Sequence, residues 1–284
     1  MLEAMRVELA GRLPLLRRGA RISTDGEGQV ILDARQLLFA SPLDLAAICA
    51  LAHATAGQAG VMFLLPDDPG VASYLQRMDV LRRLPRGTEI HGTPPPERRM
   101  DCSKVLIEVS PLSPANAQEL VTRLGELAAT HFSGGVAGLV FRGAGELIDN
   151  AVSHGDSPRG AFLSAKAYTG TTSRRPGFEF AVCDTGIGIL NHLRGNPSYA
   201  GIPDAAAALA RAIQPGVTGT AELRGYGLAD LLKITHGGGI GRLVLRSGDG
   251  IASIALQHGG RRETFAAASL PVTGTWAWLR VRFP

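Results

Sequence analysis

Residues 145–155 read GELIDNAVSHG, a helical pattern in which Glu146 and Asn150 lie four positions apart. That spacing places the two side chains on one face of a helix. The amide oxygen of Asn150 suits a hard cation such as Mg²⁺, and the carboxylate of Glu146 can orient or deprotonate a nucleophile beside that cation. The pair is equally compatible with an ordinary polar helix surface, so this stretch needs support from elsewhere in the chain.

A glycine-rich stretch further along the chain offers such support. Residues 184–189, DTGIGI, directly follow an alternating strand pattern at 178–183. An aspartate at a strand end, Asp184, can accept a hydrogen bond from the exocyclic amine of adenine. Gly186 and Gly188 allow a flat ring or another backbone segment to approach closely. A plain turn is the alternative for this stretch taken alone.

A second glycine-rich stretch, RGYGL at residues 224–228, opens a further predicted helix. The free N–H groups of a helix start, next to Gly225 and Gly227, favour an anion such as a phosphate. A simple loop-to-helix turn is again the alternative.

Taken in this order, the three stretches resemble the N box and the two glycine boxes of the GHKL superfamily, which includes gyrase B, MutL, heat-shock chaperones, sensor histidine kinases and anti-sigma-factor kinases. The resemblance covers about residues 115–284. It implies the Bergerat fold, an α+β two-layer sandwich that binds ATP and Mg²⁺. Residues 190–224 resemble the ATP lid of that family, which we expect to be mobile without nucleotide.

The resemblance also implies a role for each matching residue. Asn150 would bind Mg²⁺, and Glu146 would act as the general base. Asp184 would bind the adenine amine, with Thr275 on the last strand as a second contact to the base. The remaining matches are glycines that would shape the adenine pocket or cradle the phosphates: Gly186, Gly188, Gly225 and Gly227.

Two functional hypotheses remain open. The N box ends in His-Gly, as in the anti-sigma serine kinases, whereas His131 in THFSGG matches no phosphoacceptor motif, so we expect no autophosphorylating sensor kinase. The first hypothesis is a serine/threonine kinase or slow ATPase that acts in partner switching. The second is a non-catalytic, ATP-dependent switch that controls a protein partner. The partner would be sigma-factor-like or antagonist-like, and a homodimer is left open.

Ahead of this region, strand and helix patterns alternate, which predicts a small α/β domain with a parallel strand pair. The predicted elements are strands at 29–33 and 60–65 and helices at 42–54 and 71–84. The pattern resembles a STAS domain, the fold of anti-sigma-factor antagonists. We place the STAS-like domain at residues 1–88, a proline-rich linker at 89–102 and the ATP-binding domain at 103–284.

The STAS-like domain is expected to be degenerate. In phosphorylatable members a Ser or Thr opens the helix, and the matching position here falls near Pro42, Leu43 and Asp44, which carry no hydroxyl. Ser41 lies just ahead, and we expect it to cap the helix. The domain would therefore not be a substrate for the same chain. Instead, it would dock constitutively on the chain's own lid or on a partner.

In the second domain, the patterns predict helices on one face of a largely antiparallel sheet. The predicted helices are 115–129, 136–154 and 228–235. The predicted strands are 104–109, 161–168, 178–183, 242–246, 251–257, 262–269 and 275–283. Along 178–183, apolar residues alternate with Glu179 and Ala181, which is typical of a half-buried strand.

The composition excludes several classes of protein. With 45% hydrophobic and 19% charged residues among 284, the chain is not intrinsically disordered. Three separated cysteines exclude a disulfide-stapled miniprotein and a zinc site built on cysteine pairs. Apolar stretches are too short for a membrane span and the start is unlike a signal peptide, so we expect a cytoplasmic protein. The net charge is +4, but the arginines are scattered, so we expect no nucleic-acid surface.

Overall fold

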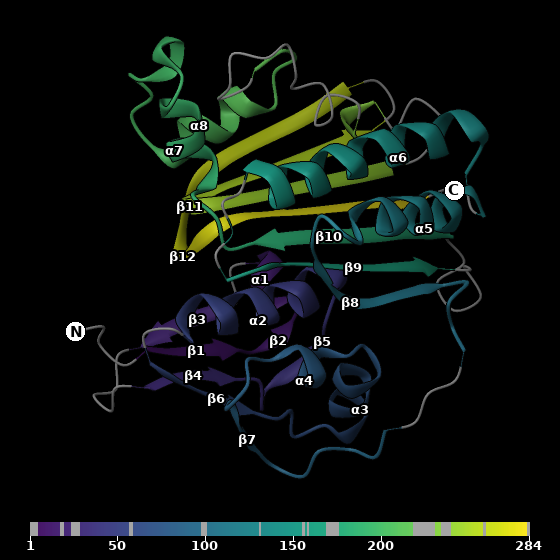
Figure 1. Ribbon diagram of the computed structural model, residues 1–284, viewed down its shortest axis with the longest axis vertical. Coiled ribbons are helices and arrows are strands. Elements are labelled where there is room, and N and C mark those ends of the chain that lie inside the picture. The colour runs from purple at the N-terminus through teal and green to yellow at the C-terminus, as the bar shows by residue number, and fades with distance from the viewer. Residues whose placement is uncertain are drawn as a thin grey trace.

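In the computed structural model, the described residues form two five-stranded β-sheets and a small two-stranded one, with one helix layer between the two large sheets and another over the outer face of the carboxy-terminal sheet (Figure 1). The structure describes residues 5–17, 20–23, 29–56, 59–97, 101–130, 132–154, 157, 159–168, 176–217, 231–233, 240–257 and 260–282. None of the helices in these ranges has the length and apolar character needed to span a bilayer.

The amino-terminal sheet has five strands in the order β3-β1-β4-β6-β7. Strands β1 and β3 are antiparallel, and the other neighbouring pairs are parallel. The predicted strands at 29–33 and 60–65 are present as a parallel pair, so that prediction is confirmed. The strands are β1 (Met5–Leu9), β3 (Ala20–Ser23), β4 (Gln29–Asp33), β6 (Gly60–Leu64) and β7 (Glu89–His91). A separate small sheet pairs β2 (Gly11–Arg12) with β5 (Leu37–Phe39).

Two predicted boundaries in this half are wrong. The linker expected at 89–102 begins too early, because Glu89–His91 forms β7 at the edge of the sheet. The single helix expected at 71–84 is two helices, because Asp79 adopts a left-handed backbone conformation with φ of 62°. The helices of this half are α1 (Pro14–Arg17), α2 (Pro42–Thr55), α3 (Pro69–Arg77) and α4 (Val80–Arg83).

The carboxy-terminal sheet has the order β11-β12-β10-β9-β8, and every neighbouring pair is antiparallel, as predicted. Its strands are β8 (Leu106–Leu112), β9 (Ala161–Tyr168), β10 (Gly177–Asp184), β11 (Ile240–Gln257) and β12 (Gly260–Arg282). The four strands predicted after residue 240 are instead one long hairpin, whose register shifts around Gly248. Two helices, α5 (Ala117–Ala129) and α6 (Gly134–Asp149), pack together over one face of this sheet. A π-helical turn, η1 (Asn150–His154), extends α6.

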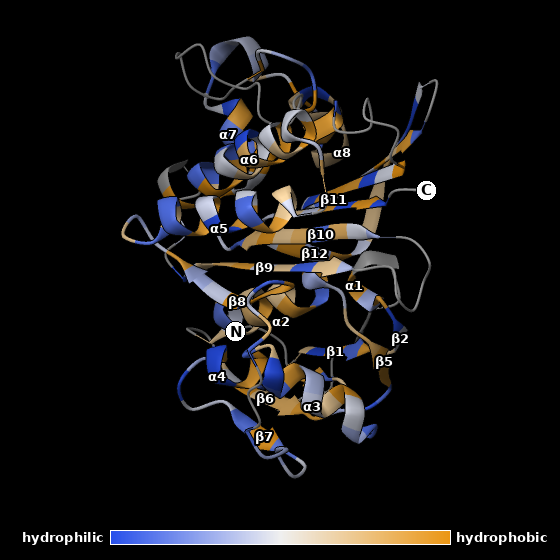
Figure 2. Cartoon of the chain, turned by 90° about the vertical axis from the view of Figure 1, so that its right-hand side faces the viewer, coloured by the Kyte–Doolittle hydropathy of each residue, from blue (hydrophilic) through white to orange (hydrophobic). Residues whose placement is uncertain are grey.

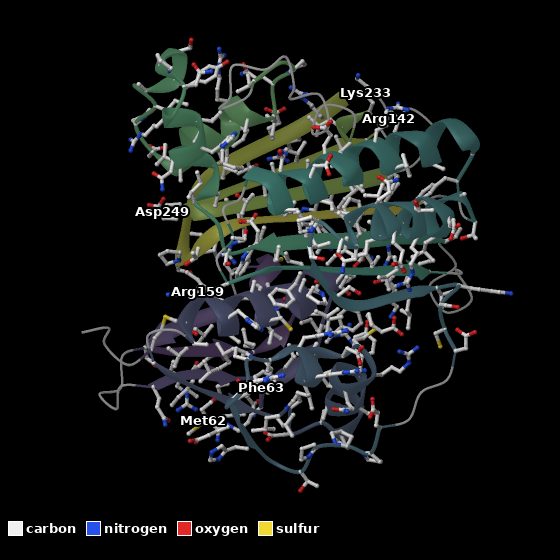
Figure 3. All side chains as sticks on the ribbon, in the orientation of Figure 1. Met62, Phe63, Arg142, Arg159, Lys233 and Asp249 are labelled. Atoms are coloured by element: carbon white, nitrogen blue, oxygen red, sulfur yellow. The ribbon has the colours of Figure 1, made fainter. Side chains whose placement is uncertain are left out.

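Helix α2 joins the two halves. It contacts β4 and β6 of the first sheet and β9, β10 and β12 of the second, and every residue from Pro42 to Ala52 is buried. Figure 2 shows apolar colouring on this helix and on the strands beside it. The guanidinium of Arg159, labelled in Figure 3, donates a hydrogen bond to the carbonyl of Ala54 at the end of α2. A helix that is apolar on all sides belongs in a core, and here the core is shared between the halves.

Within the carboxy-terminal half, α5 and α6 lie on one face of the sheet, as expected, but the cover of its other face by α2 was not predicted. The second sheet is covered on both faces, by α5 and α6 on one and by α2 on the other. Strand β10, expected to be half-buried, is buried at all of its positions. Its Phe178 and Phe180 pack with the α5–α6 layer, whereas Ala181 and Cys183 pack with α2.

The segment expected to be a mobile lid at 190–224 is partly helical. It contains α7 (Gly188–Arg194), the short helix η2 (Pro197–Tyr199) and α8 (Ala205–Ala212). Helix α8 packs on β11, and a Cβ on Gly250 of that strand would lie 2.9 Å from both the Ala205 carbonyl carbon and the Leu209 Cδ1. The segment expected to be a lid therefore contains regular helices at residues 190–194 and 205–212. Residues 218–230 lie outside the described ranges.

Candidate functional site

Asp184 ends β10 as a buried carboxylate with only 6% of its surface exposed. The N–H of Gly186 donates to its Oδ1 at 2.8 Å, and the backbone N–H of Thr275 on β12 also bonds to the carboxylate. Burial raises the pKa of Asp184 to about 6, because these two hydrogen bonds only partly offset the loss of water. No lysine, arginine or histidine of the described ranges forms an ion pair with it.

Two glycines in left-handed conformations bring backbone close to this carboxylate. Gly274 has φ of 79°, and a Cβ there would lie 2.4 Å from Oδ1 of Asp184. Gly188 has φ of 76°, and a Cβ there would lie 3.2 Å from the Gly274 carbonyl oxygen. The Gly274 distance is far below ordinary contact, a Cβ on Gly188 would also lie 2.8 Å from Ser247 Oγ, and both backbones are left-handed, so a side chain at either position would be strained. The backbone of the Gly274 turn thus packs directly against Asp184, and the Gly188 turn packs against the Gly274 carbonyl.

Ser247 on β11 connects the two turns and has no counterpart among the predicted site residues. Its hydroxyl is buried, donates to the Gly274 carbonyl at 3.0 Å and accepts from the N–H of Ile189 at 2.8 Å. A lone serine in a strand carries no sequence signal for such a role. Its importance comes from the sheet register, which pairs it with Thr275.

The register also shows what lies directly behind the site. Four residues form one row across the sheet: Arg246, Trp276, Cys183 and Phe162. Directly paired residues point to the same face, and this row faces the core shared with α2. The residues next along the three strands β11, β12 and β10 are Ser247, Thr275 and Asp184. Ser247, Thr275 and Asp184 are therefore each the chain neighbour of a residue that faces the α2 layer.

The residues of the expected metal and base site lie on α6. Glu146 is half-buried and Asn150, at the C-cap of α6, is exposed. The π-helical turn η1, which starts at Asn150, contacts β10, and Figure 1 shows this end of α6 on the side where β10 ends. Within the described residues, no group of three or more His, Cys, Asp or Glu could hold a metal ion. A cation near Asn150 would need most of its oxygen ligands from a bound phosphate and water.

The structure brings together part of the predicted set. Asp184, Gly186, Gly188 and Thr275 form one cluster. Glu146 and Asn150 lie on α6 and its C-cap, and the η1 turn that begins at Asn150 contacts β10. The predicted phosphate cradle, Gly225 and Gly227, lies outside the described residues.

The start of α2 shows why Ser41 is not a free hydroxyl. Ser41 is 1% exposed and is the N-cap of α2, as predicted. Its N–H and its hydroxyl donate to Oδ2 of Asp44 at 2.8 and 2.7 Å, and its hydroxyl accepts from the Asp44 N–H. This reciprocal arrangement is a capping box, in which the hydroxyl is fully used inside the protein.

Neither a scan of protein-family models nor a search of curated proteins gives a match to this chain.

Proposed function

We propose that the chain is an ATP-binding regulatory protein of the anti-sigma-factor kinase type, with its nucleotide site at Asp184 and a degenerate STAS-like unit at its amino terminus. The observation that carries this proposal is the buried carboxylate of Asp184, which lies at a strand end among backbone groups and has no cationic partner in the described residues. Burying an unpaired charge destabilises a fold. An amine donor from a ligand would offset that cost, and adenine offers one in the plane of its ring.

In this proposal the adenine amine donates a hydrogen bond to the carboxylate of Asp184. The Gly274 backbone packs against that carboxylate, and Gly188 lies next to the Gly274 carbonyl, so both turns border the proposed site. Thr275 follows Gly274 directly and lies beside the carboxylate, so its hydroxyl is available as a second contact to the base. Guanine carries an oxygen in place of the amine, and a carboxylate would repel it, so this arrangement favours ATP over GTP.

The fit to Mg²⁺ depends on the nucleotide. Asn150 is exposed at the end of α6 and offers one amide oxygen, with Glu146 one turn earlier on the same helix. Magnesium commonly combines one or two protein oxygens with phosphate oxygens and water. When bound, Mg²⁺ would neutralise charge on the phosphates, and the carboxylate of Glu146 would act as a proton acceptor next to them.

If the protein transfers a phosphoryl group, the burial of Ser41 restricts which hydroxyl can accept it. Ser41 is buried in its capping box and α2 is covered by both sheets, so the amino-terminal unit offers no accessible hydroxyl at the expected position. Transfer would therefore go to a separate protein. The same observation supports the second hypothesis, a nucleotide-dependent switch that changes affinity for a partner without chemistry.

Calorimetric titration of the full chain tests the proposed site. We expect Mg-ATP to bind at least about tenfold more tightly than Mg-GTP, since a charge-assisted hydrogen bond contributes about 1.5–3 kcal/mol. Equal affinities would contradict the assignment of Asp184 to the adenine amine. No binding of either nucleotide would contradict the proposed function as a whole.

A further inference from the structure

Two consecutive residues of β11 face different parts of the molecule. Ser247 holds the turns around Asp184 through its bonds to Ile189 and Gly274. Arg246 belongs to the row behind the site and is only 4% exposed. A shift of Arg246 along or across the strand would move Ser247 with it, because the two share a peptide bond.

The guanidinium of Arg246 contacts both halves of the chain. Nη1 donates to the carbonyl of Leu15 in α1 at 3.0 Å, and Nη2 donates to the carbonyl of Leu270 in β12 at 2.5 Å. The guanidinium also lies over the ring of Trp276, 5.2 Å from its centroid. A buried cation is tolerated only where it is well hydrogen-bonded, so these contacts set its position closely.

Leu15 is held from its other side by the buried side-chain carboxyl group of Asp44. Its N–H donates to Oδ1 of Asp44 at 3.0 Å, and the other oxygen of Asp44 accepts both bonds from Ser41. The chain enters α1 through Leu13, whose φ of 59° is rare for a non-glycine residue. Such a conformation persists only where the surrounding structure enforces it. Thus α1 lies in a fixed position between a carboxylate of α2 and a guanidinium of β11.

We propose that Arg246 is a positioning residue for the nucleotide site. Arg246 contacts Leu15, and Leu15 contacts Asp44. Through these contacts, the position of the amino-terminal unit against the carboxy-terminal sheet determines the conformation of the turns at Gly188 and Gly274, which surround Asp184. Coupling between two sites is reciprocal, so nucleotide binding should also strengthen the packing of the amino-terminal unit against the carboxy-terminal sheet. The ligand in this inference rests on the proposed function, but the mechanical link between α1 and the turns does not.

The test uses the full chain, two variants on the link and one matched control. Arg246→Met removes the donors at similar side-chain length, and Asp44→Asn weakens the link from the α2 side without touching the sheet. Arg242→Met is the control, since Arg242 lies on the same strand but is exposed. One measurement is amide hydrogen exchange at Ile189 without nucleotide. The other is the affinity for adenylyl imidodiphosphate with Mg²⁺.

We expect Arg246→Met and Asp44→Asn each to accelerate exchange at Ile189 and to weaken analogue binding by about fivefold or more, within the usual range of coupling between sites. The double variant should bind no more weakly than Arg246→Met alone, because both changes act through Leu15. A purely local role of Arg246 would instead leave Asp44→Asn without effect at the site. Arg242→Met should match the parent in both measurements.

Unchanged exchange at Ile189 in Arg246→Met, or independent effects that add in the double variant, would overturn the inference. If Arg246→Met does not fold, Arg246→Lys keeps the charge and one donor and should show a smaller effect of the same kind. If the parent chain binds no analogue, the proposed function fails, and the exchange measurement still decides whether α1 controls the turns.

Discussion

Replacing Asp184 by Asn should make the protein more stable and at the same time impair nucleotide binding. The substitution keeps the side-chain shape and an oxygen that accepts from the N–H groups of Gly186 and Thr275. It removes a charge that burial makes unfavourable in the folded state. A charged residue that destabilises the fold is typical of a functional site, where stability is traded for function. For Asp184, the function proposed above is ligand binding.

The size and sign of this effect follow from the pKa of Asp184, which burial raises from 3.8 to about 6. Between these values the folded protein binds more protons than the unfolded chain, so stability falls as the pH rises. The difference of about two pKa units corresponds to about 3 kcal/mol. The ionised carboxylate therefore lowers the free energy of unfolding by this amount at pH 7, and this destabilisation is absent below about pH 4. The thiol of Cys183 next along β10 does not titrate in this window, because burial raises its pKa well above the ordinary value.

Urea unfolding of parent and Asp184→Asn at several pH values between 4.5 and 7.5 measures this difference. The free energy of unfolding of the variant should exceed that of the parent by up to about 3 kcal/mol at pH 7, and the gap should shrink toward pH 4.5. Asp149→Asn is the control, since Asp149 is exposed on α6 and should give no such gap. A gap that does not change with pH would refute the reasoning. Calorimetry on the same variant should show a loss in ATP affinity of about tenfold or more.

Three further predictions concern the other residues of the proposal. Glu146→Ala should leave the affinity for ATP close to that of the parent but abolish any slow turnover, measured as ADP formed; undiminished turnover would favour the switch hypothesis. Asn150→Ala should weaken binding only when Mg²⁺ is present, which titrations with Mg²⁺ and with EDTA compare. Incubation with Mg-ATP should add no phosphate to Ser41, as measured by intact mass, and a phosphate that disappears in Ser41→Ala would show that Ser41 is phosphorylated. Ser41→Ala should lower the free energy of unfolding by about 1 kcal/mol, the usual effect of losing an N-cap.

Local patterns can point to Asp184 and the glycines after it, because they lie within one short stretch, and the turn geometry at Gly188 favours glycine. Thr275 lies beside Asp184 because the last strand pairs with β10. Their roles at a nucleotide site stay predictions. Ser247 and Arg246 were not found, since their roles depend on partners such as Leu15, 231 positions away in sequence. No pattern within a strand reports such a partner.

The packing of the two halves was missed for a different reason. The α2 sequence is apolar on every side, which is typical of a helix enclosed in a core, but this feature does not say what encloses it. In β10, Glu179 made the strand look half-exposed. It is in fact 2% exposed, and the guanidinium of Arg280 pairs with it at 2.9 Å, so its charge is neutralised inside the protein. Alternation of polar and apolar residues indicates exposure only when the polar residue has no buried counter-charge.

The enclosure of α2 has a consequence for how the protein is made. Thr55 ends this helix early in the chain, whereas β12, one of the strands that covers it, runs to Arg282. At about 5–20 residues per second, a ribosome takes on the order of 10–50 s to synthesise the chain between these points. The side of α2 that later meets β9, β10 and β12 has none of these partners until β9 and β10 are made, and it is fully covered only after β12. Fragments that stop before β9 would therefore leave this apolar side of α2 uncovered and should aggregate.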